Sequence, residues 1–271
     1  MNTPTLSNSP VSAPPTLELR LAVRTRPDEL APVMFHTWRK LLFLHWRVEP
    51  ELIRPLLPAG LTVDTFDGSA WVGVVPFEMR EIRPSWSPSV PWISNFLELN
   101  LRTYAYDEQG IPGVWFLSLN ANRVLAVTLG RRWFRLPYFT CRMSTSTDAT
   151  GLIDYRCRRL VDPEQRTCHY RYRPTGRPES ATPGTLEFFL VERYILFAMP
   201  PSGRLMRGQV WHTPYEIQAV DVEREDDQLF ALDGLPRPNR PADHAAFSPG
   251  VTVDVYPLAD SLPWVLTNSD R

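Results

Sequence analysis

The chain has 271 residues, of which 43% are hydrophobic and 22% are charged, and its net charge at pH 7 is -1. This length and composition allow a sizeable core, in one large β-rich domain or two smaller ones, and indicate a globular protein. The near-neutral charge gives no reason to expect nucleic acid or an anionic membrane surface as a partner. The sequence contains no run of about 18 apolar residues, so we expect no membrane-spanning helix.

The first 16 residues, "MNTPTLSNSPVSAPPT", are rich in Pro, Ser and Thr and are predicted to form a flexible tail. They lack the cationic start and apolar core of a secretory signal. The chain has three cysteines, an odd number, and none of them stands in Cys-x-x-Cys spacing: Cys141, Cys157 and Cys168. This pattern predicts neither a disulfide framework nor a zinc site. These features predict a cytoplasmic protein. After the tail, we expect residues 17–271 to form a single domain.

Most of the remaining chain is predicted to form strands. Residues 35–48 mix aromatic and branched side chains in an extended stretch, and the prolines of 49–60 limit that segment to one short helix. The Asp67-Gly68 pair predicts a hairpin between two β-rich runs, because both residues tolerate positive φ. Further strand-like runs are predicted over 93–106, 113–129, 151–161, 166–174, 194–199 and 204–223.

A second short helix is predicted over 185–193, with Thr185 as its N-cap. Short strands at close spacing, interrupted by two small helices, are typical of an antiparallel barrel or a pair of packed sheets. The predicted fold class is therefore mainly β (α+β), with a few short helices.

One predicted strand, "NFLELNLRTYAY", separates polar from apolar side chains by simple alternation. Glu98, Asn100, Arg102 and Tyr104 share one face of this strand, and leucines occupy most of the other. The polar face either meets water, as in many antiparallel sheets, or lines an internal cavity.

Five segments spread over about residues 35–257 carry a family resemblance. They are "FLHWRVEPELIRPLLPAGLTVDTFDGSAWVGVVPFEM", "ELNLRTYAY", "GVWFLSL", "FRLPYF" and "FSPGVTVDV". In this order they resemble segments of the YqjF-like proteins, the DUF2071 family. The resemblance implies an acetoacetate decarboxylase-like fold, in which a curved antiparallel sheet closes into a β cone or barrel around an internal cavity. It therefore favours a polar strand face that lines this cavity.

The resemblance also indicates where a reactive amine would lie. Acetoacetate decarboxylases form a Schiff base through a lysine in a Gly-Tyr/Phe-Pro-Lys type motif and carry a glutamate on a preceding strand. Laid on that pattern, "GRRWFRLPYF" places Tyr138 at the lysine position, and Glu98 falls at the glutamate position. Tyrosine cannot form an imine and arginine stays protonated, so decarboxylation through an imine is disfavoured. The only lysine, Lys40, lies well before the motif and is expected at the surface.

The remaining cavity wall is predicted to receive an anion. Arg102 and the Tyr138 hydroxyl suit a carboxylate or phosphate, because a guanidinium forms bidentate charge-assisted hydrogen bonds. Glu98 would either neutralise Arg102 or, if burial raises its pKa, act as a general base. A buried Glu98–Arg102 pair that only organises the core is an equal alternative. The other proposed ligand-binding residues are Asn100, Glu192, Arg193 and His212.

No motif predicts a metal or a cofactor. The five histidines show neither HxH nor HExxH spacing, so structural roles are favoured for them. The chain has no dinucleotide fingerprint, no phosphate-binding Gly-x-x-x-x-Gly-Lys loop and no Gly-x-Ser-x-Gly elbow. The alternating "CHYRYRP" is typical of a sheet with one wet side, so nucleic acid is not expected as a partner.

Two functions remain open. The first is a binding protein that holds a small anionic or carbonyl-containing molecule in its cavity without covalent chemistry. The second is a non-decarboxylating enzyme, of lyase or isomerase type, that uses Glu98 and Tyr138 as acid-base groups on a keto or enol acid. Binding is favoured, because the residue that would compel a reaction class is absent. Decarboxylase relatives form oligomers, so the resemblance leaves a homo-oligomer open.

Overall fold

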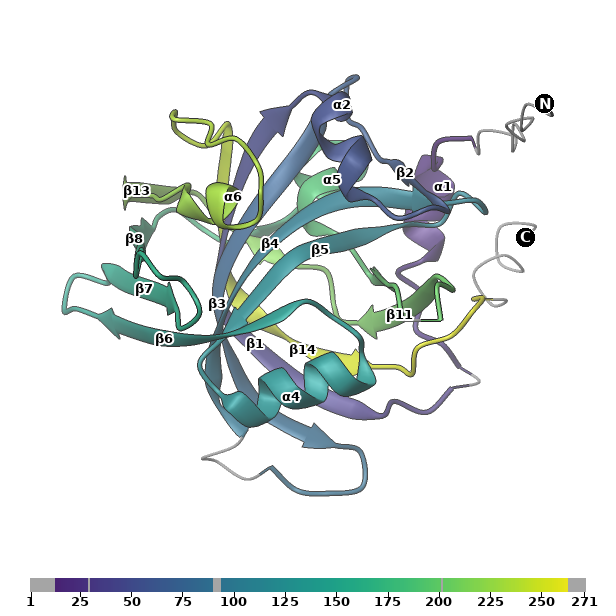
Figure 1. Ribbon diagram of the computed structural model, residues 1–271, viewed down its shortest axis with the longest axis horizontal. Helices are drawn as coiled ribbons and strands as arrows, with labels where there is room; N and C mark the ends of the chain where they lie inside the picture. Colours follow the sequence, from purple (N-terminus) through teal and green to yellow (C-terminus); the bar gives the residue numbers. More distant parts are fainter. Residues whose placement is uncertain (1–12, 29, 90–93, 201, 263–271) are drawn as a thin grey trace, which may run out of the picture.

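A computed structural model describes residues 13–28, 30–89, 94–200 and 202–262, and its main element is one continuous β-sheet (Figure 1). Within these residues, twelve strands form the sheet, and β9 (Glu179–Ser180) and β12 (Glu216–Ile217) form a separate ribbon. Residues 1–12 of the predicted tail lie outside the described residues. Thr16, at the end of that tail, caps the first helix through its side chain.

Seven strands of the sheet close into a ring. Six of its seven pairings are antiparallel, and the pairing of β5 with β10 is parallel. The ring has a cone-like shape with an enclosed interior. In order around the ring, its strands are β5 (Pro112–Ala121), β10 (Ile195–Ala198), β11 (Met206–Trp211), β14 (His244–Val255), β1 (Met34–Val48), β3 (Ala70–Pro84) and β4 (Phe96–Asp107), which pairs with β5 again.

The other strands extend the sheet away from the ring. Four of them continue from β5 toward the left of Figure 1, and one short strand adds to β4. The strand-like runs predicted over 151–161 and 166–174 contain β7 and β8, which pair with each other in antiparallel register. These strands are β6 (Tyr138–Thr147), β7 (Ile153–Arg159), β8 (Cys168–Pro174), β13 (Val220–Arg224) and β2 (Leu61–Val63).

One edge of β5 is divided between two partners. Val114 and Trp115 pair with β10, and residues 119–121 pair with the start of β6. Among the described strands, none pairs with this edge at residues 116–118. The sheet therefore has an opening at the middle of β5.

The sheet buries both of its faces. All twelve residues of β4 are buried, and its side chains alternate between two hydrophobic clusters. Tyr104 belongs to the cluster inside the ring, whereas Leu99 and Leu101 pack outside it with Trp46 and Phe230. The polar face of β4 therefore meets the interior of the ring rather than water.

The short helices confirm two sequence predictions. The segment 49–60 contains α2 (Pro50–Ile53) followed by the 3-10 turn η1 (Arg54–Leu56). The segment 185–193 contains α5 (Leu186–Val191), whose first turn is capped by the Thr185 hydroxyl, which accepts a hydrogen bond from the Phe188 amide. The sequence analysis predicts neither α1 (Leu17–Ala22) nor α6 (Gln228–Leu232).

Residues 113–129 do not form one strand as predicted. β5 ends at Ala121, and α4 (Val124–Trp133) follows and lies across the front of the cone (Figure 1). A short apolar run rich in branched residues does not distinguish a strand from a helix by periodicity alone. Here the packing of the segment against β6 and β5 favours the helix, since β-propensity depends strongly on context.

The predicted hairpin at Asp67-Gly68 is also wrong, although the turn itself exists. Asp67 and Gly68 have positive φ of 49° and 76°, and an isolated bridge joins Phe66 to Ser69. The flanking strands do not pair with each other, because β2 pairs with β4 and β3 lies between β1 and β4. Long-range pairing in the ring prevails over the local turn signal.

No helix in the described ranges has both the length and the apolar character that crossing a membrane requires.

Candidate functional site

A cavity of about 110 Å³ lies inside the ring. All seven ring strands contribute to its wall, and most of the lining side chains are apolar. Glu98 and Arg102 of β4, Arg193 after α5, and Tyr138 at the start of β6 line the same cavity. The structure therefore brings together the three side chains that the sequence analysis placed around one pocket, Glu98, Arg102 and Tyr138.

Glu98 and Tyr138 form a buried hydrogen-bonded pair. The Tyr138 hydroxyl donates to Glu98 Oε2 at 3.0 Å, and Glu98 is only 2% exposed. Burial raises the pKa of Glu98 to about 7, against smaller opposing effects of hydrogen bonds from Tyr138 and Asn100. Burial and the neighbouring Glu98 raise the pKa of Tyr138 well above its usual range. Tyr138 thus remains a hydrogen-bond donor while Glu98 titrates near neutral pH.

A glycine of α4 makes room for the Tyr138 ring. A Cβ atom at Gly130 would lie 2.5 Å from Tyr138 Cε2 and 2.6 Å from Cδ2, which is closer than packed carbon atoms approach. Gly130 is therefore required by the close approach of helix and tyrosine.

We expect Gly130→Ala to lower the free energy of unfolding by about 1–3 kcal/mol, as over-packing does in dense cores. This loss would occur although alanine is the better helix former by about 1 kcal/mol. Urea unfolding measures it, with Thr128→Ala on the exposed side of the same helix as the control. A Gly130→Ala variant as stable as the wild type would mean that the Tyr138 ring moves aside freely.

Arg102 is a buried cation without a carboxylate partner. It is 9% exposed, its Nη2 donates to the Leu190 carbonyl at 3.2 Å, and its Nε has no hydrogen-bond partner. Its guanidinium carbon lies 5.6 Å from the Phe43 ring centroid and 5.7 Å from that of Tyr104. No ion pair joins Arg102 to Glu98 or to another acid of the described residues, so the predicted Glu98–Arg102 pair does not form.

Arg193 is held more firmly than Arg102. Its Nη1 lies 2.8 Å from Asp64 Oδ2, and its Nε donates to the Phe189 carbonyl at 2.6 Å. Asp64 also pairs with Arg20 of α1 at 2.7 Å. Burial lowers the pKa of Arg193 to about 10, so the side chain stays charged at neutral pH. Its Nη2 is buried without a partner, like the Nε of Arg102.

Glu192 and His212 do not line the cavity but support a residue that does. Glu192 accepts hydrogen bonds from the Tyr215 amide at 2.8 Å and from the Tyr194 hydroxyl. The His212 ring packs between Tyr194 and Tyr215, with 4.5 Å between the ring centroids in each pair. Burial lowers the pKa of His212 to about 4, so the ring is neutral at pH 7. Both residues thereby position Tyr215, which lies in the cavity wall.

Asn100 is buried beside Glu98 on β4, outside the cavity lining. Its side chain hydrogen-bonds to Glu98, which lowers the pKa of that carboxyl, whereas its own Oδ1 has no partner. Asn100 thus acts on the cavity through Glu98.

Two polar residues of the cavity wall, His36 and Trp38 of β1, are not among the site residues predicted from the sequence. Both ring nitrogens of His36 and the Trp38 Nε1 are buried without a hydrogen-bond partner, and burial lowers the pKa of His36 to about 4. Alternation along β1 places both side chains on one face, a signal that was available in the sequence. That this face meets Glu98 and Arg102 follows only from closure of the ring.

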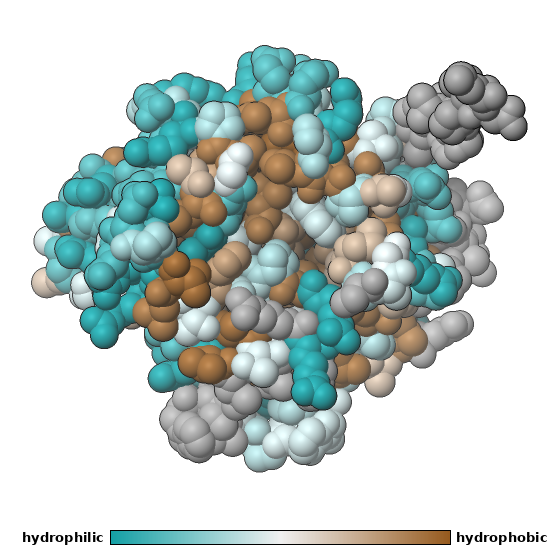
Figure 2. Space-filling model, viewed as in Figure 1, coloured by the Kyte–Doolittle hydropathy of each residue, from teal (hydrophilic) through white to brown (hydrophobic). Residues whose placement is uncertain are grey.

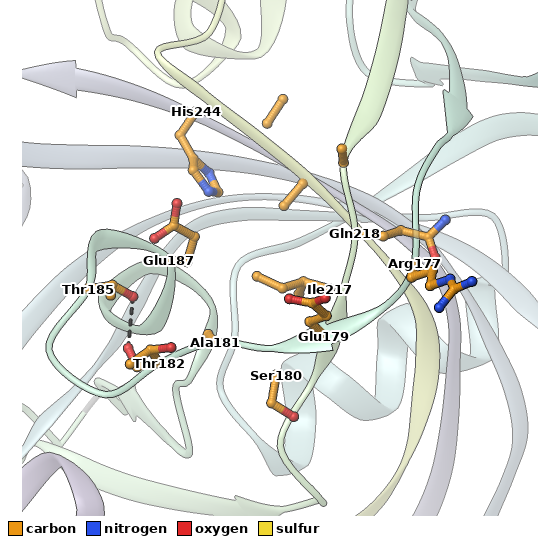
Figure 3. Close-up of a pocket in the computed structure, with 13 residues that line it drawn as sticks. Arg177, Glu179, Ser180, Ala181, Thr182, Thr185, Glu187, Ile217, Gln218 and His244 are labelled. Carbon is orange, nitrogen blue, oxygen red and sulfur yellow. Dashed lines mark hydrogen bonds between the residues drawn. The ribbon is translucent and has the colours of Figure 1, made fainter.

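A second pocket, of about 400 Å³, lies between the β9–β12 ribbon, α5 and the start of β14 (Figure 3). In Figure 3 the ring of His244 faces the carboxylate of Glu187, and Arg177, Glu179 and Gln218 lie on the other side of the pocket. None of its lining residues lines the cavity inside the ring.

A hydrogen-bonded chain leads from His244 of this second pocket into the core. The Nδ1 atoms of His244 and His45 lie 3.0 Å apart, and His45 Nε2 lies 2.7 Å from the Tyr104 hydroxyl, which donates to the Leu190 carbonyl at 2.8 Å. A carbonyl oxygen only accepts, so His45 Nε2–H donates to Tyr104 and His244 Nδ1–H donates to His45. The chain holds the same Leu190 carbonyl that accepts from Arg102.

Metal ligation is not supported by the arrangement of these side chains. Within the described part of the chain, no group of three or more His, Cys, Asp or Glu side chains is placed to hold a metal ion. The three cysteines are buried and free.

Comparison with known proteins identifies the family. Residues 36–252 match DUF2071, a family of uncharacterised conserved proteins. The uncharacterised protein YqjF of Bacillus subtilis (strain 168) is 35% identical over 206 residues, which are 76% of this chain and 84% of that protein. The chain belongs to the DUF2071 family.

Solved structures show the fold of this DUF2071 protein. Acetoacetate decarboxylase from Legionella pneumophila is 10% identical with a TM-score of 0.59, over 96% of this chain and 98% of that one. The enduracididine biosynthesis enzyme MppR, solved with pyruvate, is 16% identical with a TM-score of 0.56, over 86% and 93%. An acetoacetate decarboxylase-like enzyme from Sphingomonas wittichii RW1 is 14% identical with a TM-score of 0.55, over 85% and 93%. The acetoacetate decarboxylase-like cone predicted from the sequence is confirmed.

The DUF2071 chain places no lysine in the cavity wall. Lys40 Nζ lies 3.0 Å from Thr147 Oγ1 and 3.3 Å from Glu78 Oε1, and 39% of its side chain is exposed. Lys40 is not among the cavity-lining residues. Its surface position agrees with the sequence prediction and leaves Tyr138, rather than an amine, beside Glu98.

Proposed function

We propose that this protein binds a small carboxylate that also carries a carbonyl group, of about the size of pyruvate. The observation that carries the proposal is Arg102, a guanidinium buried in the cavity wall with no carboxylate partner. An unpaired buried charge costs several kcal/mol, which a bound anion would offset. The cavity of about 110 Å³ is somewhat smaller than an engineered cavity of about 150 Å³ that binds benzene, so it suits a ligand of no more than about six non-hydrogen atoms.

The other unpartnered groups of the wall also favour an anion. Arg193 Nη2 and Trp38 Nε1 are donors without partners, and neutral His36 has one further N–H to offer. The ligand carboxylate would bind Arg102, and its carbonyl oxygen would accept a hydrogen bond from Tyr138 or from protonated Glu98. MppR, which has the same fold, has been solved with pyruvate, and this supports the choice of a keto acid as the first ligand to test.

Titration calorimetry with pyruvate and with pyruvamide, its uncharged amide, tests the proposal. We expect pyruvate to bind at least about tenfold more tightly, since a hydrogen bond to a charged group contributes about 1.5–3 kcal/mol. Pyruvate binding should also weaken above pH 7, because ionised Glu98 repels the ligand carboxylate. Equal affinity for the two compounds, or no binding of pyruvate, would contradict the proposal.

A second candidate function, acid-base catalysis, is favoured by the pKa of Glu98. A group with a pKa of about 7, hydrogen-bonded to a tyrosine, is well suited to move protons at neutral pH. Glu98 would take a proton from C3 of a bound keto acid. The C–H electron pair would form the C=C bond, the carbonyl oxygen would become an enolate, and Tyr138 would donate a hydrogen bond to it.

Proton exchange at C3 of pyruvate in D₂O, followed by NMR, separates the two functions. Catalysis predicts exchange that is lost in Glu98→Gln, while this variant still binds pyruvate. Pyruvate that binds to the wild type without exchange identifies a binding protein.

A further inference from the structure

A third pocket opens on the outside of the ring beside the cavity. Its volume is about 590 Å³, more than five times that of the cavity. It lies at the opening in the sheet, where residues 116–118 of β5 pair with β4 along one edge and no described strand pairs with their other edge. Its lining consists of seven apolar residues and one arginine: Leu56, Trp115, Phe116, Leu117, Leu136, Pro137, Met199 and Arg135.

Phe116 and Leu136 line both this outer pocket and the cavity. Phe116 is partly exposed although it forms part of the cavity wall, whereas Leu136 is 8% exposed. Because no described strand pairs with this edge of β5 between β10 and β6, side chains rather than a hydrogen-bonded backbone separate the two spaces here. Side chains at such a boundary change rotamer far faster than strands separate, so the outer pocket offers a route into the ring that breaks no strand pairing.

The surface of this region is hydrophobic. Figure 2 shows brown side chains that continue from the region of α2 into a hollow in front of β5. Arg135 is the one charged lining residue, and it is exposed to solvent. The pocket beside His244 is lined by side chains of both charges and shares no lining residue with the cavity. It therefore offers no comparable apolar route into the ring.

We infer that the ligand is a 2-oxo acid with a branched aliphatic or aromatic side chain, and that this side chain lies in the outer pocket between Phe116, Leu136 and Leu56. The inference rests on the proposed function, in which the carboxylate binds Arg102 inside the ring. The cavity of about 110 Å³ holds the acid head, and the apolar outer pocket holds the tail that the cavity has no room for. Displacing the Phe116 and Leu136 side chains joins the two spaces.

Calorimetric titration of the full chain tests whether the outer pocket holds the side chain of the ligand. The ligands are pyruvate, 2-oxobutanoate, 4-methyl-2-oxopentanoate and phenylpyruvate. We expect affinity to rise along this series, by up to about fourfold for each added methylene that is buried. Leu56→Trp, which fills the outer pocket, should weaken phenylpyruvate binding at least about tenfold and change pyruvate binding less than about twofold. Leu160→Trp is the matched control, because Leu160 is 59% exposed and lies outside both pockets, and it should change neither affinity.

The outcomes separate the two proposals. If pyruvate binds but longer acids bind no more tightly, or if Leu56→Trp weakens all acids equally, the outer pocket does not hold a tail and only this inference fails. If none of the four acids binds, the proposed function itself fails. Should Leu56→Trp not fold, as judged by its thermal unfolding, Met199→Trp on another wall of the same pocket makes the same measurement.

Discussion

Arg102→Met is expected to raise the dissociation constant for pyruvate at least about 30-fold, because removing one partner of a buried hydrogen-bonded charge pair costs about 2–5 kcal/mol. Methionine keeps the length and apolar packing of the arginine stem but offers no donor to a carboxylate. Arg193 does not substitute for it, since Asp64 and the Phe189 carbonyl already hold its guanidinium. Titration calorimetry measures the loss.

The same substitution should leave the protein as stable or make it more stable, by up to about 4 kcal/mol, as happens when buried charges are replaced by apolar groups. Arg102 has no carboxylate partner to lose, and the Leu190 carbonyl keeps its hydrogen bond from Tyr104. Urea unfolding measures this change, and Arg132→Met at an exposed position of α4 is the control for both measurements. A variant that loses stability together with binding would show that Arg102 supports the fold rather than a ligand.

Local patterns in the sequence predict part of the site. Alternation along β4 places Glu98 and Arg102 on one face, and the family resemblance adds Tyr138 and the absence of a lysine beside it. The structure agrees with this grouping because a strand's period of two is insensitive to the rest of the fold. The rest of the cavity wall depends on which strands become neighbours.

His36 and Trp38 illustrate what the sequence does not reveal. They lie about 60 residues before Glu98 in the chain and reach the same cavity because β1, β3 and β4 are consecutive in the ring. No local motif marks them, since an isolated histidine and tryptophan on a mixed strand are compatible with many positions. The outer pocket is equally hidden, because it depends on how β10 and β6 divide one edge of β5.

The presence of a tyrosine rather than a lysine beside Glu98 affects what the glutamate can do. A protonated lysine beside Glu98 would favour its ionised form, whereas the neutral Tyr138 hydroxyl leaves burial as the largest influence on its pKa. Glu98 is thereby neutral below pH 7 and charged above it. Under the proposed function, we therefore expect an anion to bind most readily while Glu98 is protonated.

Glu98→Gln is expected to remove a pH dependence of folding stability and to make the protein more stable at alkaline pH. The pKa of Glu98 is raised from 4.5 to about 7 by burial, so between these values the folded protein keeps a proton that the unfolded chain releases. The contribution of Glu98 to the free energy of unfolding is therefore greatest below pH 4.5. It falls by about 1.4 kcal/mol per pH unit between pH 4.5 and pH 7, which is about 3 kcal/mol in all. Glutamine stays neutral throughout and still accepts the Tyr138 hydrogen bond.

Urea unfolding of both proteins from pH 4.5 to pH 8 checks this expectation. The difference in unfolding free energy should be near zero at pH 4.5 and reach about 3 kcal/mol in favour of the variant at pH 8. Buried His36 and His212, whose pKa values are lowered to about 4, impose the opposite slope on both proteins, so their effect cancels in the difference. Glu108→Gln at an exposed position of the β4–β5 turn should give no such change. A difference between Glu98→Gln and wild type that does not vary with pH would mean that Glu98 is already ionised at pH 4.5, and an ionised carboxylate beside Arg102 would oppose the binding of an anion.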